Sequence, residues 1–379
     1  MSQYMVGGEA GGESEDSGRP ALYGMSLGQL REAAAGLGLP RYAAGQMASW
    51  LYRRGCTDIA AMTDLSKAAR EALASSYRLG LEAPRSVAVS RDGTKKYLYR
   101  TADGHYVESA YIPDGDRATL CVSSQAGCRM GCRFCATGRQ GLQHSLTAAE
   151  ILNQIVSLPE RDRLTNLVFM GMGEPLDNTD NVLRALEILT SEWGFGWSPT
   201  RITVSTAGVV PQLERFLRET KVHLAVSLHN PFHEERMEIM PVERAWPIAE
   251  VASILRRHDF THQRRVSFEY IVMEGRQRLA APHTRTHEAA QRDQVPHQPD
   301  PLPPHPRLTL LLARRRTDDT LPRRTHGPRH PDHDPDIARR GHPGGMRAAE
   351  HPNARGGGRS ISGPARKFAP RTATNGTFL

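Results

Sequence analysis

"RATLCVSSQAGCRMGCRFCATG", residues 117–138, sets three cysteines, Cys128, Cys132 and Cys135, directly behind an apolar strand-like run. Three thiolates at this spacing can ligate three irons of a [4Fe–4S] cluster and leave the fourth iron open to an outside ligand. A closed zinc site needs a fourth protein ligand, for which His144 is the nearest candidate. The stretch therefore predicts a metal centre at the end of a strand, either an iron–sulfur cluster or zinc.

Strand-like and helical runs alternate from this stretch onward, for example "TNLVFMGMG" before "DNVLRALEILTSE" and "RITVSTAG" before "VVPQLERFLRE". Thr147 and Glu150 form a capping box at the first helix of the series. Repeated βα units imply a parallel sheet whose ligand lies at the C-terminal ends of the strands. Polar and glycine motifs occur at those ends, at residues 128–135, 171–175, 205–208 and 227–229.

The chain is predicted to be an α/β protein of four segments. Residues 1–21 are small, polar and acidic, and we expect a disordered lead. Residues 22–85 carry helical periodicity and predict a small accessory domain. Residues 86–275 open with an antiparallel meander, marked by Asp-Gly turns at 92–93 and 103–104, and continue as a partial (β/α)6 barrel.

The last segment, residues 276–379, is rich in Pro, His and Arg, and its composition predicts disorder apart from one apolar run, "LTLLLA". It holds 19 Lys and Arg against 9 Asp and Glu, so the formal charge of +8 for the whole chain lies entirely there. Net charge alone therefore indicates no basic RNA-binding face on the folded part. No signal peptide or 18-residue apolar run is present, so we expect a cytosolic protein without a membrane partner.

The cysteine spacing C-x3-C-x-aromatic-C, with Phe134 as the aromatic residue, resembles the signature of the radical S-adenosylmethionine superfamily. Residues 117–138 together with "NLVFMGMGEPLDN", "TVSTAGVVP" and "AVSLHNP" are similar to the RlmN/Cfr family of RNA methyltransferases. The resemblance covers roughly residues 22–275. It implies a radical S-adenosylmethionine barrel that methylates a ring carbon of adenine.

The resemblance also implies roles for residues that match the family's motifs. Cys128, Cys132 and Cys135 would hold the [4Fe–4S] cluster. Glu108 matches the proton acceptor, and Cys121 matches the cysteine that resolves a protein–RNA crosslink. The residues implied to contact S-adenosylmethionine are Gly173, Glu174, Ser205, Ser227, Leu228 and His229. From the residues alone, Cys121 would be interpreted as a core thiol and Glu108 as a solvated strand residue.

The resemblance implies methylation of carbon 2 of adenine in 23S ribosomal RNA and tRNA, with flavodoxin or ferredoxin as electron donor. Carbon 8 is the alternative target, because no motif separates the two branches. In the family, one S-adenosylmethionine methylates a cysteine near the C-terminus, and a second generates the radical that activates this methyl group. A remnant that binds a cluster or zinc without catalysis is the alternative from another class.

The sequence departs from the family after residue 275. All five cysteines, Cys56, Cys121 and the three of the motif, lie at or before position 135, so the methyl-carrying cysteine is missing. We also expect the last barrel strand and its cofactor-binding asparagine to be missing. A GC-rich gene that is read in a wrong frame gives a sequence rich in Arg, Pro and His. Our hypothesis is therefore a frameshift near codon 275. The alternative is a genuine basic tail.

Overall fold

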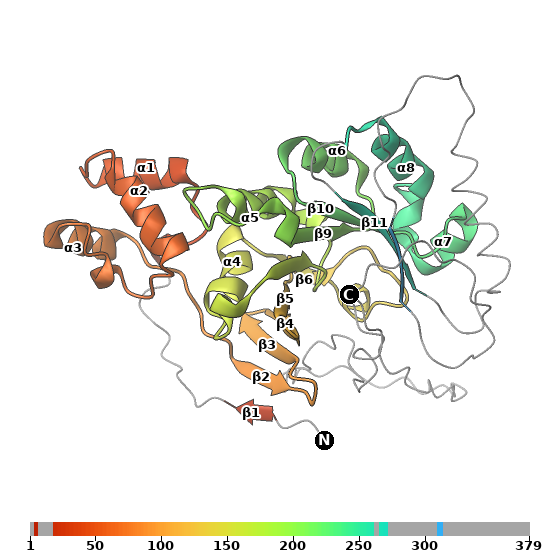
Figure 1. The fold of residues 1–379 in the computed structure, drawn as a ribbon, viewed down its shortest axis with the longest axis horizontal. Helices are drawn as coiled ribbons and strands as arrows, with labels where there is room; N and C mark the ends of the chain where they lie inside the picture. Colours follow the sequence, from red (N-terminus) through yellow and green to blue (C-terminus); the bar gives the residue numbers. More distant parts are fainter. Residues whose placement is uncertain (1–3, 7–17, 261–264, 272–308, 314–379) are drawn as a thin grey trace, which may run out of the picture.

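The computed structural model describes residues 4–6, 18–260, 265–271 and 309–313. Its N-terminal unit is a group of helices at one end of the molecule (Figure 1), comprising α1 (Leu27–Gly36), α2 (Ala43–Ala48) and α3 (Lys67–Ser76). Ser26 begins α1 with a capping box to Gln29, and α2 continues as a π-helical turn over Ser49–Arg53. The helices expected between residues 22 and 85 are therefore confirmed.

The centre of the molecule is one ten-stranded sheet in the order β1-β2-β3-β4-β5-β8-β9-β10-β11-β12. Its first half is antiparallel through β5, and from β5 onward every pairing is parallel. The strands are β1 (Tyr4–Val6), β2 (Ser86–Val89), β3 (Lys95–Arg100), β4 (Tyr106–Asp114), β5 (Arg117–Cys121), β8 (Asn166–Phe169), β9 (Ile202–Thr206), β10 (His223–Ser227), β11 (Val266–Ile271) and β12 (Thr309–Ala313). The α/β class, with a meander leading into a parallel series, is confirmed.

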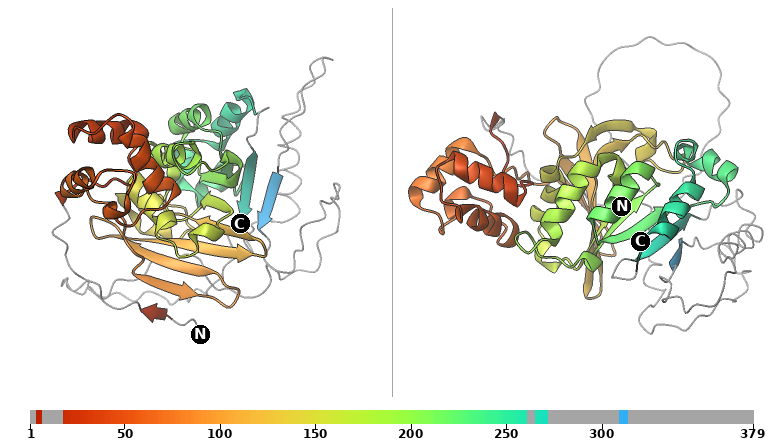
Figure 2. Two further views of the ribbon diagram at one scale, coloured as in Figure 1. Left: turned by 60° about the vertical axis from the view of Figure 1, so that its left-hand side comes forward. Right: turned by 90° about the horizontal axis from the view of Figure 1, so that it is seen from above.

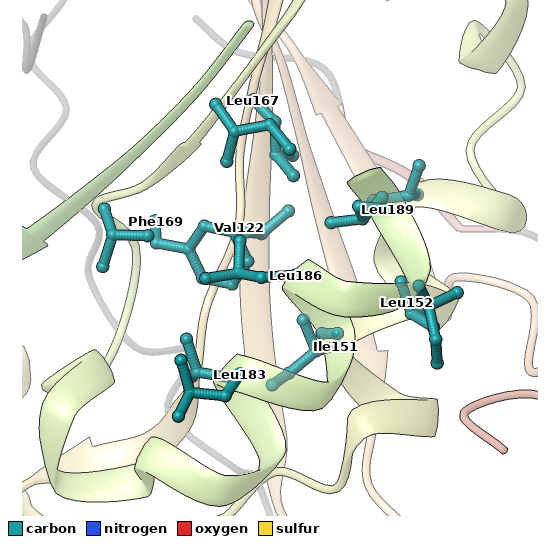
Figure 3. Close-up of a cluster of buried hydrophobic side chains, with 14 of the residues drawn as sticks. Val122, Ile151, Leu152, Leu167, Phe169, Leu183, Leu186 and Leu189 are labelled. Carbon is teal, nitrogen blue, oxygen red and sulfur yellow. The ribbon is translucent and has the colours of Figure 1, made fainter. Parts of the chain in front are cut away.

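One face of the parallel strands is covered by helices, as Figures 1 and 2 show. These are α4 (Ala148–Val156), α5 (Thr179–Thr190), α6 (Val210–Glu219) and α8 (Ile248–Arg257), with a shorter α7 (His233–Ile239) after β10. Figure 3 shows part of the core between sheet and helices, where Val122, Leu167 and Phe169 meet Ile151 and Leu186. The predicted capping box of Thr147 and Glu150 begins α4.

The N-terminal helices are joined to the core through aromatic rings. The ring of Tyr52 lies 5.9 Å from that of Trp193 and 5.7 Å from that of Phe195, on the connection between α5 and β9. The Tyr23 hydroxyl donates to the carbonyls of Leu51 and Cys56 within the helical unit. Because these rings are partly or wholly buried, the N-terminal helices share one apolar core with the sheet and its covering helices.

Two expectations about the ends of the chain are wrong for the described backbone. We expected the sixth parallel strand to be missing, but β12 pairs in parallel with β11 from Ser267↔Thr309 to Ile271↔Ala313. An apolar run inside a polar tail can still satisfy the open edge of a parallel sheet. We also expected residues 1–21 to lack structure, but β1 pairs with β2. The remaining predicted disorder, at residues 1–3, 7–17, 276–308 and 314–379, lies outside the described residues, as do residues 272–275 of the predicted barrel core.

Two further elements were not anticipated. A separate hairpin of β6 (Gln125–Cys128) and β7 (Gly141–Ser145) flanks the cysteine loop. The second is α7, which follows β10. Among the described residues, no helix is long and apolar enough to cross a membrane.

Candidate active site

Strand registers place five chemically useful side chains on the sheet face opposite the helices, which we call the inner face. Side chains alternate between faces along a strand, so paired residues share a face. Cys121 pairs with Ala110 of β4, which shares its face with Glu108 two residues earlier. Ser205 pairs with Ala225, and Ser227 pairs with Glu269. The inner face therefore carries Glu108, Cys121, Ser205, Ser227 and Glu269.

Of the three motif cysteines, Cys128 is the last residue of β6, and Cys132 and Cys135 lie in the loop that joins β6 to β7. Cys128 is buried, Cys132 and Cys135 are partly exposed, and the Cys135 amide donates to the Cys132 carbonyl at 3.1 Å. Burial raises the pKa of Cys128 and Cys132 to about 12, and repulsion between neighbouring thiolates contributes to both shifts. A bound cation reverses that penalty because it stabilises thiolates. The chemistry of the donors therefore fits a cationic iron–sulfur group.

His144 does not join these cysteines. Its Nδ1 lies 2.7 Å from Oδ2 of Asp103 and its Nε2 lies 3.1 Å from Oε2 of Glu150, so both ring nitrogens face carboxylates. Within the described part of the chain, no three His, Cys, Asp or Glu side chains gather closely enough to hold a single metal ion. In this structure His144 is therefore not placed as a fourth ligand beside the three cysteines.

The loop after β8 carries the predicted cofactor residues Gly173 and Glu174. Gly173 has a φ of +99°, and a Cβ there would lie 2.7 Å from the backbone nitrogen of Gln125, so the position requires glycine. The buried Glu174 carboxylate accepts from the Leu176 amide at 3.0 Å, the Thr206 hydroxyl at 2.6 Å and the Ala207 amide at 2.8 Å. Burial raises its pKa to about 6. Glu174 thus fastens the β8 loop to the end of β9.

Gln125 connects that loop to the cysteine hairpin. Its Oε1 accepts from the Glu174 amide at 2.9 Å, and its Nε2 donates to Asp177 at 2.9 Å. Arg129, inside the cysteine motif, donates to the same Asp177 oxygen at 2.8 Å. The cysteine loop and the glycine motif are therefore held together by side chains that lie inside the quoted motifs but to which the sequence analysis assigned no role.

The segment Ser227–Leu228–His229 begins with the last residue of β10 and is held from two sides. Amides of Leu228 and His229 both donate to the Glu269 carbonyl at 3.0 Å. His229 has a φ of +53°, uncommon for a residue with a side chain, and its ring meets Phe134 of the cysteine motif edge to face at 4.9 Å. Burial lowers the pKa of His229 to about 3, so the ring is neutral.

Arg236 of α7 supports the same segment from within. Its guanidinium donates to the carbonyls of Leu228 at 3.0 Å and of Ala207 and Ser227 at 2.9 Å. It also pairs with Glu243, and both side chains are fully buried. Sequence reasoning missed this pair, because Arg and Glu in a helical stretch read as solvent-exposed. The sequence offered only two opposite charges seven residues apart, among several other charged residues.

Glu108 and Cys121 lie near each other on neighbouring strands, as their predicted roles require. The Glu108 carboxylate pairs with Lys96 at 3.1 Å; burial raises its pKa, and Lys96 partly offsets the shift. Cys121 is buried, and burial, with a smaller contribution from the Glu269 carboxylate, raises the pKa of its thiol to about 12. Glu108 is thus buried rather than solvated, contrary to the interpretation from residues alone.

Comparisons with known proteins identify two domain families and close relatives of the chain. Residues 122–278 match the radical SAM superfamily, and residues 21–79 match the ribosomal RNA large subunit methyltransferase N-terminal domain. A probable dual-specificity RNA methyltransferase RlmN of Bacteroides fragilis is 57% identical over 254 residues, covering 67% of this chain and 74% of the relative. The dual-specificity RNA methyltransferase RlmN of Geobacter sulfurreducens is 47% identical over 254 residues, covering 67% and 71%.

A solved structure is also similar. The crystal structure of a radical SAM methyltransferase from Sphaerobacter thermophilus matches with a TM-score of 0.65 and 42% identity, covering 70% of this chain and 80% of that one. Family membership implies a [4Fe–4S] cluster and S-adenosylmethionine as cofactors, which the three thiols of the cysteine loop fit. The chain therefore belongs to the radical SAM RNA methyltransferases of the RlmN type.

Proposed function

We propose that this protein's family activity is methylation of carbon 2 of adenine in 23S ribosomal RNA and in tRNA. The observation that carries the proposal is the combination of a three-cysteine loop with Glu108 and Cys121 on the adjoining inner face. When bound, the cluster and S-adenosylmethionine supply a 5′-deoxyadenosyl radical, which an electron-poor ring carbon requires. Gly173, Glu174, Ser205 and residues 227–229 are proposed to position the cofactor.

The proton and sulfur chemistry falls to two residues of this chain. Glu108 lies in a buried position that raises its pKa, so it can accept a proton from the substrate carbon with Lys96 beside it as counter-charge. Cys121 is held as a neutral thiol by burial. It becomes a nucleophile towards a sulfur centre only when it loses that proton.

The methyl-cysteine route of the family needs a further cysteine, and this sequence has none after Cys135. We therefore propose that this chain cleaves S-adenosylmethionine but leaves adenine unmethylated. We further propose that residues 276–379 derive from a frameshift near codon 275, since the superfamily match ends at residue 278. Resequencing codons 265–285 tests this: a single inserted or deleted base that restores a downstream cysteine supports the frameshift, and a confirmed frame contradicts it.

The decisive experiment is anaerobic reconstitution followed by cofactor analysis. We expect about four irons and four sulfides per chain, and formation of 5′-deoxyadenosine from S-adenosylmethionine when a flavodoxin or ferredoxin system supplies electrons. Cys135→Ser should abolish both results, whereas Cys56→Ser, a buried thiol of the N-terminal unit, should abolish neither. One zinc per chain, with no iron, would refute the radical mechanism.

Methylation position and RNA target need a separate measurement on a form with a restored carrier cysteine. Digestion of treated 23S ribosomal RNA and tRNA, followed by nucleoside analysis, distinguishes 2-methyladenosine from 8-methyladenosine. We expect the carbon-2 product in both RNAs and a cytoplasmic enzyme without a membrane partner. The carbon-8 product is the second candidate outcome, since the motifs are shared by both branches.

A further inference from the structure

Glu269, on the inner face, contacts or pairs with several of the residues predicted to bind the cofactor. Its Oε2 accepts from the Ser205 hydroxyl at 3.0 Å, and its strand partner in β10 is Ser227. Its backbone carbonyl accepts from the amides of Leu228 and His229. Four residues predicted to contact S-adenosylmethionine are thus in direct contact or in register with one glutamate to which no role has been assigned.

The Glu269 carboxylate is short of partners. Within the part of the chain that the structure describes, Ser205 is its one hydrogen-bond donor and no Lys, Arg or His forms an ion pair with it. Glu108 has Lys96, and Glu174 has three donors. Burial raises the pKa of Glu269, which shows that its ionised form is poorly stabilised. A ligand that binds at the inner face through hydroxyl groups would supply the hydrogen-bond donors that the Glu269 carboxylate lacks.

The position of Glu269 relative to the cysteines indicates which part of the cofactor its carboxylate would contact. The Glu174 amide donates to Gln125, at the start of the cysteine hairpin, whereas Glu269 lies on β11, three strands from β8 in the sheet. In the order of the sheet, Glu269 is therefore farther than Glu174 from β5 and the cysteine hairpin that follows it. Family membership implies that the methionine end of S-adenosylmethionine would face the cluster, so the groups farther along the molecule are the ribose and the adenine. Of these, the vicinal ribose hydroxyls offer a carboxylate two adjacent donors.

We propose that the Glu269 carboxylate binds the ribose hydroxyls of S-adenosylmethionine, while the Ser205 hydroxyl holds one carboxylate oxygen in place. The resulting contact selects a ribonucleoside cofactor and fixes its orientation at the end of β11. It rests on the cofactor and not on the identity of the RNA or of the methylated carbon. Its failure would therefore leave the proposed RNA methylation untouched.

The test is equilibrium binding to the full chain with its cluster reconstituted and no reductant present, so that the cofactor stays intact. Three ligands are compared: S-adenosylmethionine, S-adenosylhomocysteine, which lacks the sulfonium charge, and the 2′-deoxyadenosyl analogue of S-adenosylmethionine. Glu269→Gln keeps the side-chain shape. Glu187→Gln, an exposed carboxylate on α5, controls for the change in net charge. Affinities are referred to iron content, so that partial cluster loading is corrected.

Glu269→Gln should weaken S-adenosylmethionine and S-adenosylhomocysteine by the same factor, about tenfold or more, because a charge-assisted hydrogen bond is lost in both. The wild type should bind the deoxy analogue more weakly, and this penalty should shrink in the variant. A loss confined to S-adenosylmethionine would place the carboxylate at the sulfonium and overturn the proposal. Equal binding of the deoxy analogue by the wild type would also overturn it, whatever the variant does.

Discussion

Replacing Arg236 tests whether the loops of the active site depend on one buried cation. Arg236→Met removes the arginine that faces the fully buried Glu243, which keeps its contact with His233. It also takes one donor from three carbonyls, of which Leu228 still accepts from the Asn230 amide. Leaving one member of a buried ion pair uncompensated costs about 3–5 kcal/mol, and each orphaned buried group adds about 1–3 kcal/mol. We therefore expect a loss of at least roughly 4 kcal/mol, a large part of the total stability of a typical domain.

Glu243→Gln should be milder, at roughly 1–3 kcal/mol, because the three carbonyls continue to solvate the guanidinium and the Gln oxygen can still accept from the Ile248 amide. Urea denaturation followed by tryptophan fluorescence measures both variants on the cluster-free chain. Arg236→Lys, which keeps the charge but not the fork of donors, is the intermediate control. If Glu243→Gln cost as much as Arg236→Met, the three carbonyl contacts would contribute little and the argument from them would be refuted.

Three further changes test other parts of the site. Gly173→Ala should lower the free energy of unfolding in urea by several kcal/mol more than Gly38→Ala, because both glycines have a positive φ but, of the two, only Gly173 has a backbone atom where the Cβ would lie. Equal losses of stability would show that backbone strain alone sets the cost. The folded state holds His229 neutral with a pKa of about 3, so the stability it contributes is present above its unfolded pKa of about 6.5 and is lost as pH falls towards 3. His229→Asn, which tolerates positive φ, should flatten the dependence of the unfolding free energy on pH between these values. An unchanged pH dependence would contradict the assignment to His229. Cys135→Ser should bind no intact cluster after reconstitution while Cys56→Ser binds a full complement of iron, and equal iron in both would remove Cys135 from the ligand set.

Local sequence signals predicted the elements well where they depend on nearest neighbours. The capping box of Thr147 and Glu150, the Asp-Gly turns of the meander and the βα alternation each rest on residues a few positions apart, and each appears in the structure. The β6–β7 hairpin was missed because its second strand, "GLQHS", is polar and partly exposed and lacks the alternation of a strand. The pairing of β12 was missed because composition outweighed one short apolar run.

Site geometry was less predictable, since it depends on contacts between residues far apart in the chain. The cysteines could be found from spacing, but the support of their loop by Gln125 and Asp177 joins residues 52 positions apart. Arg236 reaches Ala207, 29 positions away, and Ser205 reaches Glu269, 64 positions away. No periodicity or motif encodes such contacts, because any polar residue of suitable length at those positions would leave the local pattern unchanged.

Three glutamates near the inner face show how partners decide what one residue type can do. Glu174 has three donors on its carboxylate, so it joins two loops and has little capacity left for a ligand. Glu108 faces Lys96, which compensates its ionised form; Lys96 is partly exposed, so protonation of Glu108 leaves a cation that water can reach. Among the described residues Glu269 has Ser205 as its one donor and therefore retains the capacity to accept from a ligand. If the three were interchangeable, Glu→Gln at each position would have the same effect. Their partners instead predict lost loop stability at Glu174, lost proton transfer at Glu108 and weaker cofactor binding at Glu269.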